Sequence, residues 1–363
     1  MMLLHRRRWL GCLLVSLLAA PLSAAEKVEF PFKDGDRVAW MGSSSTAIGV
    51  WPKAMEFLLR TRHPELKLVY RNYGLSGGTF AIAVDRVDEW CEKFQPTLVL
   101  FCYGGNDARN GKPGLGKFTD SIDKCVAKAQ GHGARVLLCT MQGIDGRQAG
   151  KTLTANRKFF AEAQLAYAQE KRWPIVDVFH PLEHLQEEGQ KQDNAFTINR
   201  DGVHLTDSAY IAWSYFLYDN LIPTPRSSLA ELTAKGQVTS TAHCRISDLK
   251  ASESGMTFTR ADEILPILPP IPLPPRAWVP LEKLSDYRLK VTDLPKGDYE
   301  LLADGQVVAK VTEADLAKGI NLNAGRLDAG STTPWDALAK RVWDAKDLEQ
   351  IGKTAWRFEL KKL

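Results

Sequence analysis

The sequence predicts an α/β domain built on a parallel sheet, followed by a smaller β-rich module. Two observations lead to this prediction. Between about residues 38 and 221, short apolar runs alternate with stretches of helical period, a pattern typical of βαβ units. The apolar runs in the middle of this region are nearly continuous, as in strands that are buried on both faces.

Five apolar runs are the predicted strands, and they are VAWM (38–41), KLVYRN (67–72), TLVLFC (97–102), RVLLCT (135–140) and PIVDVF (174–179). The predicted helices lie after these runs, at about 50–62, 80–93, 118–131, 154–171 and 207–220. In a sheet of this kind, ligands bind at the carboxyl ends of the strands. We therefore expect the functional residues to follow the strands directly.

The first 25 residues have the layout of a secretory signal. Arg6, Arg7 and Arg8 form a positive segment, an apolar stretch follows, and Ser23 and Ala25 are the small residues before the expected cleavage. The apolar stretch is shorter than the roughly 20 residues that cross a bilayer. We therefore expect a signal peptide over 1–25, export to the periplasm or the extracellular space, and no membrane span in the mature chain.

The chain changes character after the α/β region, which we assign to residues 26–225. We interpret residues 226–286 as a linker region. Within it, residues 264–280 hold seven prolines, which favours a stiff spacer lying on the domain surface. Residues 287–363 are the predicted module, with a β-meander of about three strands over 287–311 and a helix at roughly 334–350. We expect this module to pack against the larger domain.

Composition excludes several classes of protein. With 47 basic and 43 acidic residues, three of the basic ones in the signal, the mature chain is close to neutral and has no dense basic cluster for nucleic acid. Five cysteines remain after processing, an odd number that leaves at least one free thiol. A disulfide between Cys102 and Cys139 is possible, but buried thiols are favoured. No spacing recommends a metal site, and we expect no cofactor.

Glycine-rich and polar segments follow three of the predicted strands, and a fourth precedes the last predicted helix. They are GSSST (42–46), YGLSGGT (73–79), YGGND (103–107) and NRDGVHLTDSAY (199–210). Together they supply serine hydroxyls, glycine amides, an asparagine amide, a histidine and a carboxylate. Acyl transfer needs this set, namely a nucleophile, a base, a residue that orients the base, and donors for an oxyanion.

These four segments, in this order, resemble the blocks of the SGNH or GDSL-type hydrolases, a family of secreted esterases and lipases. GSSST resembles the first block, G-D-S-[LI]-[ST], and NYGLSGGT resembles the second. GGND is the third block in full, and DGVH is the last one, D-x-x-H. The resemblance covers about residues 35–222 and implies a three-layer α/β/α, flavodoxin-like fold, here with a C-terminal extension.

The resemblance implies a role for each motif residue. Aligning Gly42 with the family glycine makes Ser44 the nucleophile, and puts Ser43 in place of the family aspartate, where its hydroxyl could partly hold the loop. His204 is implied as the base and Asp201 as the residue that orients it. Ser44, Gly77 and Asn106 are the implied oxyanion-hole residues. An ordinary histidine pKa of about 6.5 suits a proton shuttle.

The expected activity is ester hydrolysis through an acyl-enzyme, with small-molecule or polysaccharide esters as substrates. Short acyl groups such as acetyl on carbohydrate are preferred, because no long apolar run near the motifs marks a lipase lid. Two alternatives remain. One is a weakly active or inactive glycan-binding protein, suggested by Ser43, and the other is an O-acyltransferase that uses the same acyl-enzyme. The sequence does not indicate an oligomeric state.

Overall fold

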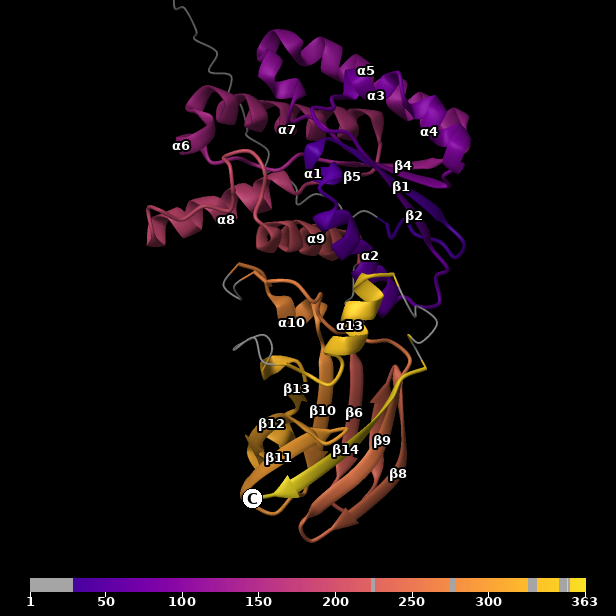
Figure 1. Cartoon of the computed structure of the whole chain (residues 1–363), viewed down its shortest axis with the longest axis vertical. Coiled ribbons are helices and arrows are strands. Elements are labelled where there is room, and N and C mark those ends of the chain that lie inside the picture. Colours follow the sequence, from indigo (N-terminus) through magenta and orange to yellow (C-terminus); the bar gives the residue numbers. More distant parts are fainter. Residues whose placement is uncertain (1–28, 223–225, 275–277, 326–331, 346–350, 352) are drawn as a thin grey trace, which may run out of the picture.

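The structure, a computed structural model, describes residues 29–222, 226–274, 278–325, 332–345, 351 and 353–363. An α/β domain lies at one end of the molecule, and a β-rich module formed by the C-terminal part of the chain lies at the other (Figure 1). The predicted signal peptide, residues 1–25, lies outside the described residues. Within the described part, no helix is both long and apolar enough to cross a membrane.

The α/β domain is built on a five-stranded parallel sheet, as predicted. Its strands are β1 (Arg37–Gly42), β2 (Val69–Gly74), β3 (Leu98–Cys102), β4 (Arg135–Cys139) and β5 (Ile175–Val176). Their order in the sheet is β2-β1-β3-β4-β5, the flavodoxin-like order. The strand predicted over 174–179 is reduced to two residues, since the chain enters a helix at Phe179.

Helices cover both faces of the sheet, which confirms the three-layer architecture (Figure 1). Alternate residues of β1 point to opposite faces: Val38 and Trp40 lie in one buried cluster, Ala39 and Met41 in the other. The first cluster contains residues of α2 (Val50–Arg62), α8 (Phe179–Gln192) and α9 (Asp207–Leu221). The second contains residues of α3 (Phe80–Val84), α4 (Val87–Phe94), α5 (Leu115–Gly131) and α7 (Lys151–Lys171).

Two helices differ from the prediction. The helix predicted at 80–93 is split into α3 and α4, with Asp85 and Arg86 between them. Helix α8 was not predicted, because Pro181 and Gly189 interrupt its pattern. Pro181 lies in the first turn, where its missing N–H costs no intrahelical hydrogen bond. Short helical turns also follow strands at α1 (Ser44–Ala47), η1 (Asp107–Asn110), η2 (Lys112–Gly114) and α6 (Gly146–Ala149).

The C-terminal module consists of two sheets that share one core, rather than a meander. The first sheet has the order β13-β10-β6-β7 and the second β12-β11-β14-β9-β8. The strands are β6 (Ser228–Thr233), β7 (Val238–Ala242), β8 (Cys244–Ser252), β9 (Gly255–Asp262), β10 (Tyr287–Thr292), β11 (Asp298–Ala303), β12 (Gln306–Thr312), β13 (Ile320–Asn321) and β14 (Ala355–Lys362). Leu232 and Leu289 of the first sheet lie in one buried cluster with Phe258 and Phe358 of the second.

This arrangement corrects two predictions. The expected meander over 287–311 is wrong, because β10 pairs in parallel with β6 in one sheet while β11 and β12 form a hairpin in the other. The linker assigned to 226–286 is also wrong, because residues 228–262 form β6 to β9. Strands β7 and β8 are largely exposed and rich in polar residues, so their sequences resemble a linker. The helix predicted at 334–350 is present as α13 (Asp336–Trp343).

The first part of the proline-rich segment, residues 264–269, is buried, so the surface-spacer interpretation is wrong for these residues; residues 275–277 of the segment lie outside the described part of the chain. Ile264, Leu265 and Ile267 are at most 1% exposed. The guanidinium of Arg62, at the end of α2, donates hydrogen bonds to the carbonyls of Ile267 and Leu284. The apolar residues between the prolines therefore form part of the interface between the two parts of the chain.

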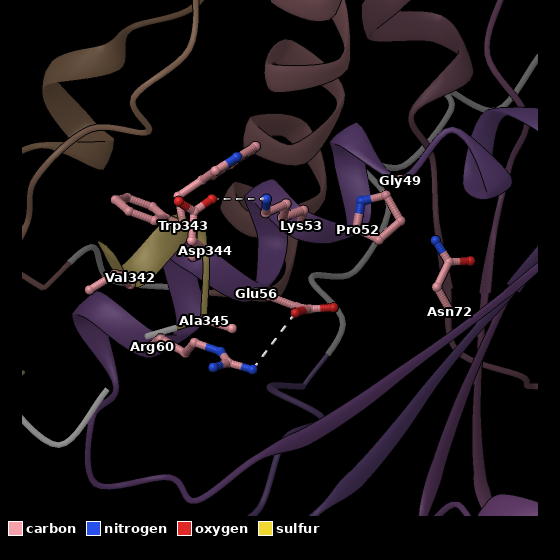
Figure 2. A pocket seen from close by; sticks show the side chains of 11 residues that line it. Gly49, Pro52, Lys53, Glu56, Arg60, Asn72, Val342, Trp343, Asp344 and Ala345 are labelled. Carbon is pink, nitrogen blue, oxygen red and sulfur yellow. Dashed lines mark ion pairs between the residues drawn. The ribbon is translucent and has the colours of Figure 1, made fainter. Parts of the chain in front are cut away.

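Helix α13 also joins the module to the domain. It packs against α2, and a cavity of about 280 Å³ lies between them. Figure 2 shows two ion pairs among the residues that line this cavity. The ammonium group of Lys53 lies 3.7 Å from the carboxylate of Asp344, between α2 and the module, and the guanidinium of Arg60 lies 3.7 Å from the carboxylate of Glu56 within α2. The module therefore packs against the larger domain, as expected from the sequence.

The five cysteines that follow the predicted signal peptide are all buried free thiols. Cys102 and Cys139 end neighbouring strands but form no disulfide. Burial, together with the neighbouring Cys139 thiol, raises the pKa of Cys102 well above its ordinary value. This agrees with buried thiols, the interpretation that the sequence favoured.

Candidate active site

The five predicted site residues come from four segments at one edge of the sheet. Ser44 follows β1, Gly77 follows β2 and Asn106 follows β3, each within a few residues of the strand's carboxyl end. Asp201 and His204 lie in the loop between α8 and α9. Parallel strands bring their carboxyl ends to the same edge, so residues far apart in sequence converge there.

We call residues 43–47 the nucleophile turn, after the predicted nucleophile Ser44. Its three serines have different surroundings. Ser43 is the N-cap residue of α1, and its hydroxyl makes no hydrogen bond to the described residues. Ser44 is the first residue of α1 and is half-buried, and its backbone N–H has no partner in the described part of the chain. Ser45 is 2% exposed and accepts a hydrogen bond of 2.7 Å from Gln142 Nε2. Only Ser44 presents its hydroxyl to the histidine.

His204 lies between Ser44 and Asp201. Its Nε2 is 2.9 Å from Ser44 Oγ, and its Nδ1 is 2.7 Å from Asp201 Oδ2. A proton on Nδ1 is thus held by the carboxylate, and Nε2 is left to accept the serine proton. The arrangement matches the geometry of a serine nucleophile, a base and an orienting acid.

Asp201 also fixes the loop that carries the histidine. Its Oδ1 accepts the backbone N–H groups of His204, at 2.6 Å, and Val203, at 3.0 Å. Burial acts to raise the pKa of Asp201, but the hydrogen bonds from His204 and Val203 outweigh it and lower the pKa to about 2. The carboxylate is therefore ionised at neutral pH and can stabilise a protonated imidazole.

Gly77 and Asn106 supply further hydrogen-bond donors at the same edge of the sheet as Ser44. Gly77 has a φ of +74°, a conformation that favours glycine, and its N–H has no acceptor among the described residues. Asn106 Nδ2 donates to the carbonyl of Gly78 at 3.0 Å, which fixes the side-chain amide next to the Gly77 loop. With the N–H of Ser44, these groups form the set of donors that an oxyanion hole requires.

Two neighbouring polar residues hold the loops rather than take part in the chemistry. The carboxylate of Asp107 accepts the N–H groups of Phe80 and Gly104, both at 3.1 Å. Burial raises the pKa of Asp107 to about 6, although these hydrogen bonds oppose the shift. Asn72 Nδ2 donates to the carbonyl of Thr46 at 2.7 Å, which ties β2 to the nucleophile turn.

Gln142 is a site residue that the sequence did not reveal. Besides Ser45, its Nε2 donates to the carbonyl of Val203 at 3.2 Å. It thus links the turn that carries Ser44 to the loop that carries His204. The available signal was its place just after β4, at the same edge of the sheet as the motif residues.

Comparisons with known proteins identify a family match and solved structures with a similar fold. A model of the GDSL-like lipase/acylhydrolase family matches residues 35–212. A solved structure described as BT4096, a gut microbial diltiazem-metabolizing enzyme, covers 94% of this chain and 100% of its own, with a TM-score of 0.75 and 21% identity. That similarity extends to the C-terminal module and shows the fold alone.

Smaller solved structures match only about half of the chain. Axe2, an acetylxylan esterase from Geobacillus stearothermophilus, covers 53% of this chain and 96% of its own, with 16% identity and a TM-score of 0.46. LAE5, an enzyme from the metagenome of Lake Arreo, covers 53% and 97%, with 18% identity and a TM-score of 0.45. No curated protein matches the chain.

Proposed function

Since residues 35–212 belong to the GDSL-like lipase/acylhydrolase family and the protein is therefore an ester hydrolase, we propose that it cleaves carboxylic esters through a triad of Ser44, His204 and Asp201. One observation carries the proposal: His204 Nε2 lies 2.9 Å from Ser44 Oγ while Asp201 holds Nδ1 at 2.7 Å. This is the contact through which a base activates a serine.

In the proposed reaction, Ser44 Oγ attacks the ester carbonyl and His204 Nε2 accepts the hydroxyl proton. The carbonyl oxygen becomes an oxyanion that the N–H groups of Ser44 and Gly77 and the amide of Asn106 stabilise. A single donor of this kind contributes about 2.7–4 kcal/mol to the transition state. The C–O bond to the alcohol then breaks, His204 protonates the leaving oxygen, and an acyl-Ser44 ester remains.

Water completes the proposed cycle. His204 removes a proton from the water, the resulting hydroxide attacks the acyl carbon, and the C–O bond to Ser44 breaks as its Oγ regains the proton. Asp201 remains ionised throughout and stabilises the imidazolium at each stage. A sugar hydroxyl in place of water would make the same acyl-enzyme a transferase.

The proposed substrates are short acyl esters of hydroxyl-rich alcohols such as carbohydrates. The exposed residues beside the site residues support this choice, because Ser76 precedes Gly77, Arg200 precedes Asp201, and Gln148 lies against Gly202. Their side chains can hydrogen-bond to hydroxyl groups. We also propose that the protein is exported, on the strength of the signal pattern over residues 1–25.

Covalent trapping tests the proposal directly. A fluorophosphonate should label the folded protein at Ser44, and peptide mass spectrometry identifies the labelled residue. Labelling should be lost in His204→Ala, because the serine is then no longer activated. If folded protein with Ser44 intact takes up no label, the esterase proposal fails, and the glycan-binding alternative becomes the one to test with acetylated oligosaccharides.

The low pKa of Asp201 predicts how the stability of the protein and its kcat/KM for ester hydrolysis depend on pH. Its native-state pKa of about 2 is below the ordinary value, so the stabilisation that the carboxylate provides is present above the unfolded pKa and is lost only as the pH falls toward 2. We therefore expect the ionisation of Asp201 to leave kcat/KM unchanged from about pH 4 upward. A fall in kcat/KM between about pH 5 and pH 3 that disappears in Asp201→Asn would contradict this low pKa.

A further inference from the structure

A buried arginine lies against Gly105, the residue that precedes Asn106. Arg157, on α7, is 2% exposed. In the described part of the chain, its Nε and Nη1 groups have no hydrogen-bond acceptor and no carboxylate lies within ion-pair distance. A buried charge without compensation is costly. By contrast, the buried Arg62 donates to two carbonyls. The folding of α7 therefore does not account for the buried charge of Arg157.

The guanidinium of Arg157 lies against Gly105, the residue before Asn106. A Cβ on Gly105 would lie 3.2 Å from Nη2, 3.3 Å from Cζ and 3.6 Å from Nε. These distances are similar, so several atoms of the guanidinium, and not just one, lie close to the Gly105 backbone. Glycine leaves the space for this approach. Helix α7 also packs against η1, which begins at Asp107.

No carboxylate of the described residues forms an ion pair with Arg157. Burial, followed by the like charge of Arg109, lowers the pKa of Arg157 to about 10, and Tyr210 opposes the shift. The side chain therefore stays positive at neutral pH. The carboxylate of Asp107 accepts hydrogen bonds from the N–H groups of Phe80 and Gly104 instead. A positive charge thus remains beside the segment that carries Asn106.

We propose that Arg157 is a positioning residue for the esterase reaction: its charge, held against Gly105, favours the negative charge that develops on the ester carbonyl oxygen at the Asn106 amide. The proposal rests on the proposed function, because it needs the oxyanion. Arg157 forms no bond to the substrate and transfers no proton. It acts through the Gly105–Asn106 segment, where the low dielectric of the interior makes a fixed charge more effective than in water.

The test compares neutral and charged variants at this position. In Arg157→Met and Arg157→Gln, we expect kcat for a short-chain ester to fall about tenfold to hundredfold and KM to stay within about threefold, since the charge acts on the transition state. Arg157→Lys, which keeps the charge, should stay within about fivefold of wild type. The matched control is Arg109→Gln, which removes the neighbouring exposed charge and should change kcat by less than about threefold.

An alkylboronic acid gives an independent measurement, because it forms an anionic tetrahedral adduct on an activated serine. Its inhibition constant should rise in the neutral variants by the factor that kcat/KM falls. The proposal is overturned if kcat in both neutral variants matches wild type, if Arg157→Lys loses as much activity as they do, or if both neutral variants fail to fold. If the boronic acid does not inhibit wild type and Ser44→Ala keeps its activity, the esterase mechanism itself has failed.

Discussion

Ser44→Ala should lower kcat for ester hydrolysis about 10⁴- to 10⁶-fold without unfolding the protein. In the proposed mechanism His204 activates the hydroxyl of Ser44, and removal of the nucleophile from a triad costs about this much. Ser44 is half-buried, and its hydroxyl contacts His204 rather than the core, so the fold does not depend on it. Initial rates with a short-chain ester, together with thermal melting of both proteins, measure the two effects separately.

Ser45→Ala and Ser43→Ala are the matched controls, because the same atom is removed from adjacent residues. Both should keep kcat within about tenfold. Ser45→Ala loses the hydrogen bond from Gln142, a change of about 1 kcal/mol in the free energy of unfolding. If Ser45→Ala were the inactive variant and Ser44→Ala remained active, the alignment of the nucleophile turn would be wrong.

Asp262→Asn in the C-terminal module should lower the free energy of unfolding by about 3–5 kcal/mol. Asp262 and Arg260 have fully buried side chains, with Asp262 Oδ1 2.9 Å from Arg260 Nε. Asp262 also accepts the hydroxyls of Ser228, at 2.7 Å, and Tyr287, at 2.6 Å. The amide has the shape of the carboxylate but no charge, so the substitution leaves the buried Arg260 guanidinium without its counter-charge.

The control for this prediction is Glu359→Gln, the same acid-to-amide change in the second sheet of the module. Glu359 lies 3.1 Å from Lys361, and the two side chains are 42% and 49% exposed. Exposed ion pairs contribute about 0–1 kcal/mol, so we expect little change. Urea denaturation of the three proteins measures the difference. An Asp262→Asn variant as stable as Glu359→Gln would show that the buried network does not hold the two sheets together.

Most of the α/β domain could be predicted from the sequence because its signals are local. Helix α2 was predicted at its observed bounds, 50–62, since its apolar residues recur at helical spacing. Strands β1, β3 and β4 are apolar runs buried on both faces. The predictions failed where the local pattern was interrupted, as at Pro181 in α8, or where exposed polar strands such as β7 resembled a linker.

The order of the motifs identified the candidate site, but the contacts within it depend on the fold. Ser44 and His204 are 160 residues apart in the chain and 2.9 Å apart in the structure. Gln142 and Arg157 belong to no motif. Their roles follow from what packs against them, namely Ser45 and Gly105. No periodicity or spacing in the sequence records such a contact.

The sequence by itself therefore determined the α/β class, the strands and helices with a regular period, and the residues that supply the chemistry. These depend on interactions within a few residues of each other, which a short window of sequence contains. Only the tertiary structure decided that β10 pairs with β6 and β14 with β9, that residues 264–269 of the proline-rich segment are buried, and that Arg157 lies against Gly105. These outcomes depend on contacts between distant segments, because strand pairing and the burial of charge are set by the surrounding packing rather than by local preference.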